Sequence, residues 1–377
     1  MQKIAVLGLG KVGTLAAELL AQGGFSVIGL DQAAAVRKYP FPVSMIDVAD
    51  AEALRKELLQ VDSVLSCLPY HLNTGVAKVA HAAGIHYFDL TEDVSTTKAV
   101  TELSKTSSGL MAPQCGLAPG FVGIVGADLI SKFDDCRSCK MRVGALPQHP
   151  TGLMGYSFNW SPAGVVNEYL NDCEVLEEGT IKWVSAMEWV EKLFIGGTEL
   201  EAFTTSGGLG TMCETYKDAV PNMDYKTMRY PGHVKLMNFF FHELLMRERR
   251  TEAEQILVNA KPPVSDDVVY VHVAAEGMID GKLAREEFVR AYYPLELAGR
   301  QRSAIAWTTA SSVVAVIEMV RDGKLPQKGF LKQEDIPLGT LLETTTGTPF
   351  KGAASNWRMG YRSFGLMALR SANQSCF

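Results

Sequence analysis

The sequence predicts an α/β fold in which a doubly wound parallel sheet is followed by a second α+β domain with a mixed, largely antiparallel sheet. Two observations support this expectation. Over residues 1–120, short apolar segments alternate with helical segments, which is typical of parallel sheets covered by helices. Beyond residue 120, the strand candidates come closer to a hairpin pattern, which favours antiparallel pairing.

The expected elements follow in chain order. In the first part, strands are expected over residues 4–7, 25–30, 43–46, 63–68, 85–88 and 109–112, with helices over 14–20 and 73–83. In the second part, strands are expected over 140–145, 180–185, 226–230, 268–274 and 287–293, with a turn over 277–282 and a buried helix over 303–321. These elements divide the chain into a dinucleotide-binding domain (1–120), a substrate and dimerisation domain (121–325) and a segment (326–377) that we expect to pack back on the first domain.

Composition narrows the class of protein. The 377 residues are 47% hydrophobic and 21% charged with a net charge of −6, which indicates a soluble globular protein and argues against nucleic acid as a partner. No signal peptide and no apolar run of about 18 residues is seen, so we expect a cytoplasmic protein without a membrane partner. Cys136 and Cys139 form a lone C-x-x-C without a second ligand pair, so no metal site is predicted and reduced thiols are expected.

The glycine motif near residue 10 predicts a dinucleotide site. Gly8, Gly10 and Gly13 follow an apolar strand and open a helix, where glycines permit a tight turn, close approach of the backbone to a pyrophosphate and close helix packing. The next apolar strand ends on Asp31, an acidic residue that can bind the ribose hydroxyls of NAD and would repel the 2′-phosphate of NADP. The sequence therefore predicts NAD as the preferred cofactor. The alternative is a glycine turn in an ordinary α/β unit with a surface aspartate.

The carboxyl ends of the predicted parallel strands mark the expected site, since ligands of such sheets bind beyond that edge. The residues that fall there are Asp31, Asp47, the segments 69–71 and 89–93, and the segment 117–120.

Three further stretches carry a resemblance to a known family. They are Gln114-Cys-Gly-Leu-Ala-Pro-Gly120, Gly155-Tyr-Ser-Phe-Asn-Trp-Ser-Pro-Ala-Gly164, and Leu200-Glu-Ala-Phe-Thr-Thr-Ser-Gly-Gly208, the last followed by Lys226-Thr-Met-Arg-Tyr-Pro-Gly-His233. With the N-terminal glycines, they resemble the saccharopine dehydrogenase and lysine 6-dehydrogenase family in the same order and at comparable spacing.

The resemblance implies a nicotinamide-dependent enzyme, usually a dimer, that oxidises an amine at the ε-carbon of lysine or reduces the corresponding imine. It implies that Arg229 binds a substrate carboxylate through a two-pronged hydrogen bond, with Thr91 and Asn159 also on the substrate side. The cofactor-binding residues expected from the motif and the resemblance are Gly8, Gly10, Lys11, Val12, Gly13, Asp31, Asp47, Leu68, Pro69, Tyr70, Asp89, Leu90, Leu117, Ala118, Pro119, Trp160 and Ser161.

The proton-transfer residue is not fixed by the pattern. The catalytic candidates are Tyr70, His71, Asp93 and His233, with Glu92 beside them on the same rim. Each has a plain structural alternative: a turn histidine for His233, a ring that caps the sheet for Tyr70, and a solvated helix start for the two acids. Arg229 has the alternative of a structural salt bridge, and Trp160 that of a core residue.

One departure bears on the substrate. Glutamate-forming saccharopine dehydrogenases carry Asp-Pro-Gly where this chain has Ala118-Pro119-Gly120, and the resemblance implies that this aspartate contacts substrate. Ala118 therefore favours a lysine 6-dehydrogenase-like oxidative deamination. The alternatives are a saccharopine dehydrogenase, a related carboxyalkyl-amine dehydrogenase, and a dinucleotide-binding regulator without catalysis.

Overall fold

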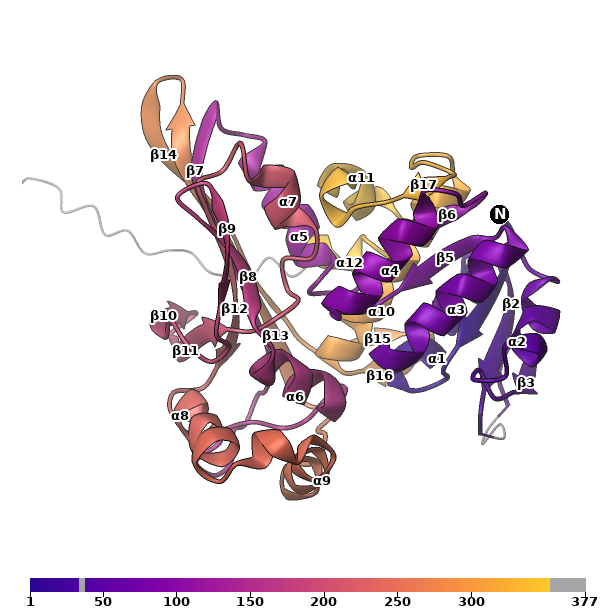
Figure 1. The fold of residues 1–377 in the computed structure, drawn as a ribbon, viewed down its shortest axis with the longest axis horizontal. Helices are drawn as coiled ribbons and strands as arrows, with labels where there is room; N and C mark the ends of the chain where they lie inside the picture. The colour runs from indigo at the N-terminus through magenta and orange to yellow at the C-terminus, as the bar shows by residue number, and fades with distance from the viewer. Residues whose placement is uncertain (34–37, 353–377) are drawn as a thin grey trace, which may run out of the picture.

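The computed structural model describes residues 1–33 and 38–352. Two sheets stand side by side in it, each with its own covering helices (Figure 1). The N-terminal sheet is wholly parallel, and the second is mixed and mostly antiparallel, which confirms the predicted fold class.

The parallel sheet has seven strands in the order β17-β6-β5-β4-β1-β2-β3. Their bounds are β1 (Lys3–Leu7), β2 (Ser26–Asp31), β3 (Val43–Met45), β4 (Ser63–Ser66), β5 (His86–Asp89), β6 (Leu110–Ala112) and β17 (Gly329–Phe330). The last strand comes from the segment after residue 325 and pairs with β6. The predicted domain limits stay predictions, and the part of the predicted C-terminal segment after residue 352 lies outside the described residues.

Both faces of this sheet are buried, because the side chains of each strand alternate between two hydrophobic clusters. In β1, Ile4 and Val6 enter one cluster, whereas Ala5 and Leu7 enter the other. The helices that supply the second cluster are α2 (Ala51–Leu58), α3 (Tyr70–Ala83) and α4 (Val94–Ser104). The first cluster is covered by α1 (Lys11–Gln22), which packs against α10 (Ala304–Arg321).

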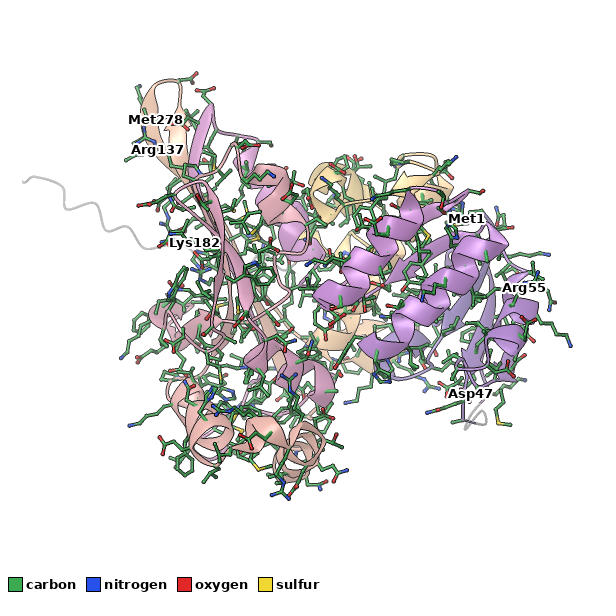
Figure 2. All side chains as sticks on the ribbon, viewed as in Figure 1. Met1, Asp47, Arg55, Arg137, Lys182 and Met278 are labelled. Carbon is green, nitrogen blue, oxygen red and sulfur yellow. The ribbon has the colours of Figure 1, made fainter. Side chains whose placement is uncertain are left out.

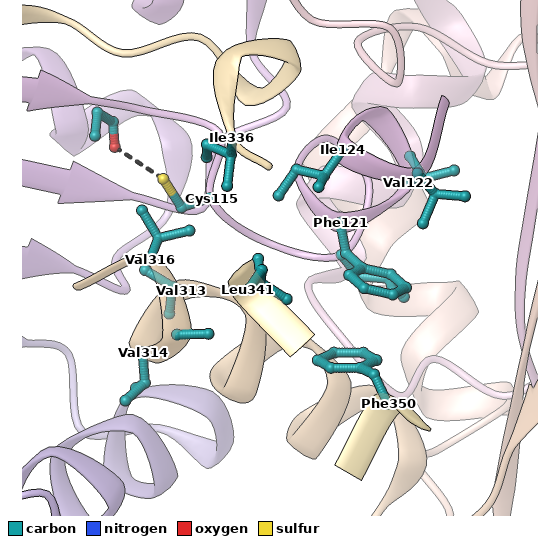
Figure 3. Close-up of a cluster of buried hydrophobic side chains, with 14 of the residues drawn as sticks. Cys115, Phe121, Val122, Ile124, Val313, Val314, Val316, Ile336, Leu341 and Phe350 are labelled. Atoms are coloured by element: carbon teal, nitrogen blue, oxygen red, sulfur yellow. Dashed lines mark hydrogen bonds between the residues drawn. The ribbon is translucent and has the colours of Figure 1, made fainter. Parts of the chain in front are cut away.

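Helix α10 is the predicted apolar helix near residue 303. It is long and apolar enough to cross a membrane, but 83% of its residues are buried inside the fold. Two segments far apart in the sequence meet here, because Ile336, Leu341 and Phe350 pack toward α10 and α5 (Phe121–Ile130) in Figure 3. The rings of Phe121 and Phe350 stack with centroids 4.1 Å apart. Helix α10 is therefore a core helix between the two sheets.

The second sheet has a central path in the order β10-β11-β12-β7-β13-β14, with β8 pairing with β12 and β9 pairing with β8. Only β12 and β7 pair in parallel. The bounds are β7 (Asp135–Pro147), β8 (Cys173–Glu177), β9 (Thr180–Val184), β10 (Glu191–Ile195), β11 (Thr198–Thr204), β12 (Asn222–Arg229), β13 (Asp267–Ile279) and β14 (Lys282–Tyr292).

The remaining elements are short helices around this sheet and one small ribbon. They are α6 (Pro162–Leu170), α7 (Met212–Tyr216), α8 (His233–Asn238), η1 (Phe239–Glu243), η2 (Met246–Glu248), α9 (Arg250–Ala260), β15 (Leu295–Leu297), β16 (Arg300–Arg302), η3 (Gln333–Asp335), α11 (Leu338–Glu343) and α12 (Pro349–Gly352). Helices α6, α8 and α9 lie together at one end of the sheet (Figure 1).

Several predicted boundaries differ from those of the structure, and two of the differences have a clear local reason. The hairpin turn expected over six residues is only Asp280-Gly281, both with positive φ (50° and 70°), which is the conformation of a two-residue hairpin. Helix α3 begins at Tyr70 rather than at Asn73, because Pro69 with its fixed φ of −54° is a suitable residue before the first helical turn.

Candidate active site

The glycine loop between β1 and α1 has the conformation that its residues predict. Gly8 has a φ of 84°, a region that side chains disfavour, and a Cβ on Gly13 would lie 1.9 Å from the Gly8 carbonyl oxygen. A Cβ on Gly10 meets nothing within 4 Å, so this glycine faces open space. Gly10 precedes α1 without any side-chain cap, which leaves the first backbone N–H groups of α1 directed at that space.

Asp31 stands at the carboxyl end of β2, beside this loop. Its carboxylate accepts hydrogen bonds from the backbone N–H of Leu9 (2.6 Å) and of Ala33 (2.8 Å). The loop, the uncapped helix N-terminus and the acidic residue fit a dinucleotide with its pyrophosphate at α1 and a ribose at Asp31. When bound, a nicotinamide dinucleotide supplies an acceptor or donor of hydride at this edge of the sheet.

A cavity of about 460 Å³ extends from the glycine loop to the second sheet. Its wall is formed by the unit built on the parallel sheet (the dinucleotide unit) and by the unit built on the mixed sheet (the second unit). A substrate and a nicotinamide can therefore meet inside it. The predicted site residues that line it are Gly10, Lys11, Val12, Gly13, Leu68, Pro69, Tyr70, Leu90, Thr91, Leu117, Ala118, Asn159, Trp160, Ser161 and Arg229.

Arg229 is the last residue of β12 and reaches this cavity from the second sheet. The residue is 3% exposed, and its guanidinium lies 4.4 Å from the ring centre of Tyr156. Its Nε donates to the Tyr169 hydroxyl (2.8 Å) and one Nη donates to the Met228 carbonyl (2.9 Å). In the described part of the chain no carboxylate pairs with Arg229, so the structural salt bridge is not the arrangement found.

His233 supports Arg229 from behind and does not line the cavity. The residue is fully buried, with Nδ1 3.1 Å from the Met154 carbonyl and Nε2 3.0 Å from the Tyr169 hydroxyl. The carbonyl can only accept, so Nδ1 carries the proton and Nε2 accepts from Tyr169, which in turn accepts from Arg229. Burial and the neighbouring Arg229 lower the pKa of His233 to about 3, so the ring is neutral. The prediction of His233 as a catalytic residue is corrected to that of a positioning residue.

Asn159 presents an unused donor to the same cavity. Its side-chain oxygen accepts from the backbone N–H of Val264 (2.7 Å), which fixes the orientation of the amide. Its Nδ2 is buried and has no hydrogen-bond partner. A buried unpaired donor is costly, and a ligand oxygen would satisfy it.

The acidic pair at the start of α4 divides into two roles. Asp93 caps α4 by accepting from the backbone N–H of Thr96 (2.7 Å), so its predicted catalytic role is not supported by its placement. Glu92 instead lines the cavity and stands near Trp160 around Gly164. Burial, with Asp93 and Asp89 nearby, raises the pKa of Glu92 to about 7. Glu92 is the carboxyl group at the cavity that can exchange a proton near neutral pH.

Several other predicted residues lie away from the cavity wall. His71 is exposed in the first turn of α3, because that helix begins three residues earlier than expected. The Asp89 carboxylate is fully buried and accepts from Tyr87 Oη (2.7 Å), Thr91 N (3.0 Å) and Gln114 N (2.9 Å), so it joins β5 to the segment after β6 and does not face the cofactor.

The remaining predicted residues are Asp47, Gly8, Pro119 and Tyr70, of which Tyr70 lines the cavity. Asp47 follows β3 on the outer side of the dinucleotide unit, and its carboxylate accepts from the Ala49 N–H (Figure 2). Gly8 and Pro119 shape the loops next to the cavity without lining it. Tyr70 does line it, and burial raises the pKa of its hydroxyl, which therefore stays protonated.

Three residues of this site were missed from the sequence: Tyr156, Glu168 and Tyr169. Tyr156 lies in the second of the three stretches given in the sequence analysis. It contacts Arg229, which is more than seventy residues away in the sequence, and no local pattern reveals such a contact. Glu168 and Tyr169 lie on α6 and are buried, at 6% and 1% exposure. In the sequence, a glutamate followed by a tyrosine on a short helix looks the same as in any amphipathic helix, so nothing marks these two residues as part of a site.

Comparison with known proteins agrees with this geometry. Residues 4–112 match the saccharopine dehydrogenase NADP binding domain, and residues 116–345 match the saccharopine dehydrogenase C-terminal domain. Apo saccharopine dehydrogenase (L-Glu forming) from Saccharomyces cerevisiae has a similar fold, with a TM-score of 0.70 and 17% identity over 91% of this chain and 97% of that one.

Two curated relatives are much longer than this chain and match it over part of their length. Alpha-aminoadipic semialdehyde synthase of Arabidopsis thaliana is 28% identical over 142 residues, which are 36% of this chain and 13% of that protein. The mitochondrial protein of the same name from Rattus norvegicus is 26% identical over 261 residues, which are 63% of this chain and 28% of that protein. The chain thus spans less than a third of either relative. The two matched domains nevertheless cover most of the chain, in order, and the chain belongs to the saccharopine dehydrogenase family of oxidoreductases.

Proposed function

We propose that the protein oxidises the ε-amine of lysine with a nicotinamide dinucleotide and releases ammonia. The observation that carries this proposal is the composition of the cavity wall. A fixed arginine and an unpaired amide donor face it from the second unit, and Glu92, with a pKa of about 7, faces it from the dinucleotide unit. When the carboxylate of the substrate is held at Arg229 and Asn159, the amine at the other end of the substrate can reach Glu92.

Each group has a defined task in this reaction. Arg229 and Asn159 bind the substrate carboxylate. Glu92 accepts a proton from the ε-ammonium, so that the neutral amine can lose hydride from its carbon to the bound dinucleotide. Glu92 then assists a water molecule that adds to the resulting iminium carbon. Ammonia leaves and the aldehyde that remains can cyclise onto the α-amine.

Charge favours lysine over saccharopine. The charged residues among those that line the cavity are Lys11, Glu92, Glu168 and Arg229, and Lys11 stands at the glycine loop. Saccharopine carries a glutarate in addition to the lysine carboxylate, and its further carboxylates would lie near the Glu92 carboxylate that the reaction requires. Ala118 at the cavity wall, where glutamate-forming enzymes of the resemblance carry aspartate, supports the same choice.

We expect Asp31 to select NAD, although the matched domain is described as NADP binding. Asp31→Ala should weaken NAD and narrow its advantage over NADP, because a ribose acceptor and a charge that repels the 2′-phosphate are lost together. Kd values for both dinucleotides measure this. Asp31→Asn is the matched control, since it keeps an acceptor for the Leu9 N–H but removes the charge. Unchanged discrimination in both variants would remove Asp31 from the ribose site.

The reaction is tested by following dinucleotide reduction with lysine alone and with saccharopine alone, each with NAD and with NADP. Turnover with lysine and ammonia release in equal amounts are expected. Turnover only with saccharopine would replace the proposal by a saccharopine dehydrogenase. Tight dinucleotide binding without turnover of either substrate would favour the non-catalytic regulator.

A further inference from the structure

An acidic and a basic side chain face the cavity from the second unit without meeting each other. Glu168 on α6 is 6% exposed and lines the cavity, and no hydrogen bond in the described part of the chain involves its carboxyl group. Arg229 on β12 lines the same cavity, 3% exposed, with tyrosine hydroxyls and a carbonyl as its partners. The two residues are close enough to influence each other electrostatically, yet they form no ion pair.

This separation is unusual for buried charged side chains. Burial of a charged group without a partner costs several kcal/mol, so such groups in native proteins are paired or bind a ligand. The Tyr169 hydroxyl fixes the Arg229 guanidinium through its Nε, and Tyr169 follows Glu168 on the same helix. The arrangement keeps a carboxyl group and a guanidinium group apart across space that a ligand can fill.

We propose that Glu168 and Arg229 together bind the α-amino acid head group of the substrate, with Glu168 contacting the α-ammonium and Arg229 the carboxylate. This rests on the proposed function, in which the reacting amine lies at the far end of the same molecule. It goes beyond that function by assigning recognition of the α-amine to a named residue. The protein then selects free α-amino acids and rejects amines or acids that carry only one of the two groups.

The positions of the two acids separate this role from proton transfer. Glu92 follows β5 in the dinucleotide unit, whereas Glu168 lies in the second unit with Arg229 and Asn159. We therefore assign the reacting amine to Glu92, which comes from the unit that binds the dinucleotide, and the head group to Glu168, which shares its unit with the arginine. An amino acid with an amine at each end satisfies both carboxyl groups.

Glu168 also predicts a proton released on binding. Burial, with Glu92 nearby, raises the pKa of Glu168 well above its ordinary value, while Arg229 opposes the shift. The shift favours the protonated carboxyl group in the free protein, and contact with an ammonium group favours its ionised form. Binding of an α-amino acid should release this proton to the buffer, and binding of a simple carboxylic acid should not.

L-Norleucine and hexanoate isolate the head group, because both have the lysine carbon chain without the ε-amine and only norleucine has an α-amine. Calorimetry of the full chain, with and without NAD and in two buffers of different ionisation enthalpy, gives the affinity and the protons released for each compound. We expect a preference for norleucine that falls about tenfold or more in Glu168→Gln, together with loss of the proton release. Glu168→Asp should restore part of both, and Glu296→Gln, the same change at an exposed position on β15, should alter neither.

Two results would contradict the assignment of Glu168 to the head group. A wild-type protein without preference for norleucine, or an equal loss of affinity for both compounds in Glu168→Gln, would overturn the head-group assignment. Lysine oxidation is assayed in parallel on the same samples. Its absence would contradict the proposed reaction and leave the binding comparison readable, because neither norleucine nor hexanoate has to react.

Discussion

Glu92→Gln is expected to lower kcat for lysine oxidation by roughly a hundredfold to ten-thousandfold, the range for loss of a positioned general base. The amide has the shape of the carboxyl group but cannot accept a proton from the ammonium or assist water. Steady-state kinetics with saturating dinucleotide measures this effect. Dinucleotide affinity should hardly change, because the expected phosphate and ribose contacts lie at the glycine loop and at Asp31 and not at Glu92.

The pH profile provides the second readout for Glu92. The reaction needs the ionised carboxylate, and the pKa of Glu92 in the free protein is raised to about 7, so kcat/KM should be low in acid and rise as the pH passes through about 7. Glu92→Gln should lack this ionisation. His233 cannot supply it, since its pKa is lowered to about 3. Asp93→Asn is the adjacent control: it should weaken α4 and move the Glu92 ionisation to a lower pH without removing it, because Asp93 raises the pKa of Glu92. A wild-type ionisation near 7 that persists in Glu92→Gln would exclude Glu92 as the base.

Arg229→Ala should raise KM for lysine by roughly a hundredfold or more and change the dinucleotide Kd far less. Removing one partner of a buried charge-assisted contact costs about 2–5 kcal/mol, and each 1.4 kcal/mol is a factor of ten. Arg229→Lys retains the charge but not the planar fork, so we expect only partial recovery. The converse pattern, a large loss of dinucleotide affinity with KM unchanged, would assign Arg229 to the cofactor.

Tyr169 and His233, which are hydrogen-bonded in series to Arg229, provide a further test of how the guanidinium is oriented. Tyr169→Phe removes the oxygen that accepts from Arg229 Nε and the hydroxyl that faces His233 Nε2. We expect it to raise KM in the same direction as Arg229→Ala but by a smaller factor, because the guanidinium is present and less well oriented. Thermal unfolding of each variant separates misorientation from loss of the fold.

Local patterns in the sequence were sufficient for the dinucleotide half of the protein. Gly8, Gly10, Gly13 and Asp31 act within one strand-turn-helix-strand unit, so their spacing in sequence nearly fixes their spacing in space. The parallel sheet followed for the same reason, since each strand is apolar on both faces. The mixed second sheet was predicted in kind, but β8, β10 and β11 were not, because β8 and β11 lack a regular alternation of buried and exposed residues and β10 has only five residues.

The sequence by itself predicted a dinucleotide site at the start of the chain, and the family resemblance placed Arg229 on the substrate side as an expectation. Only the tertiary structure distinguished Glu92 from Asp93, which are consecutive in the sequence: the Asp93 side chain caps α4, whereas Glu92 lines the cavity. It likewise moved His233 from the reaction to the support of Arg229, and it placed Glu168 across from that arginine. Such roles depend on burial and on contacts between residues sixty or more positions apart, for which a sequence pattern has no local physical cause.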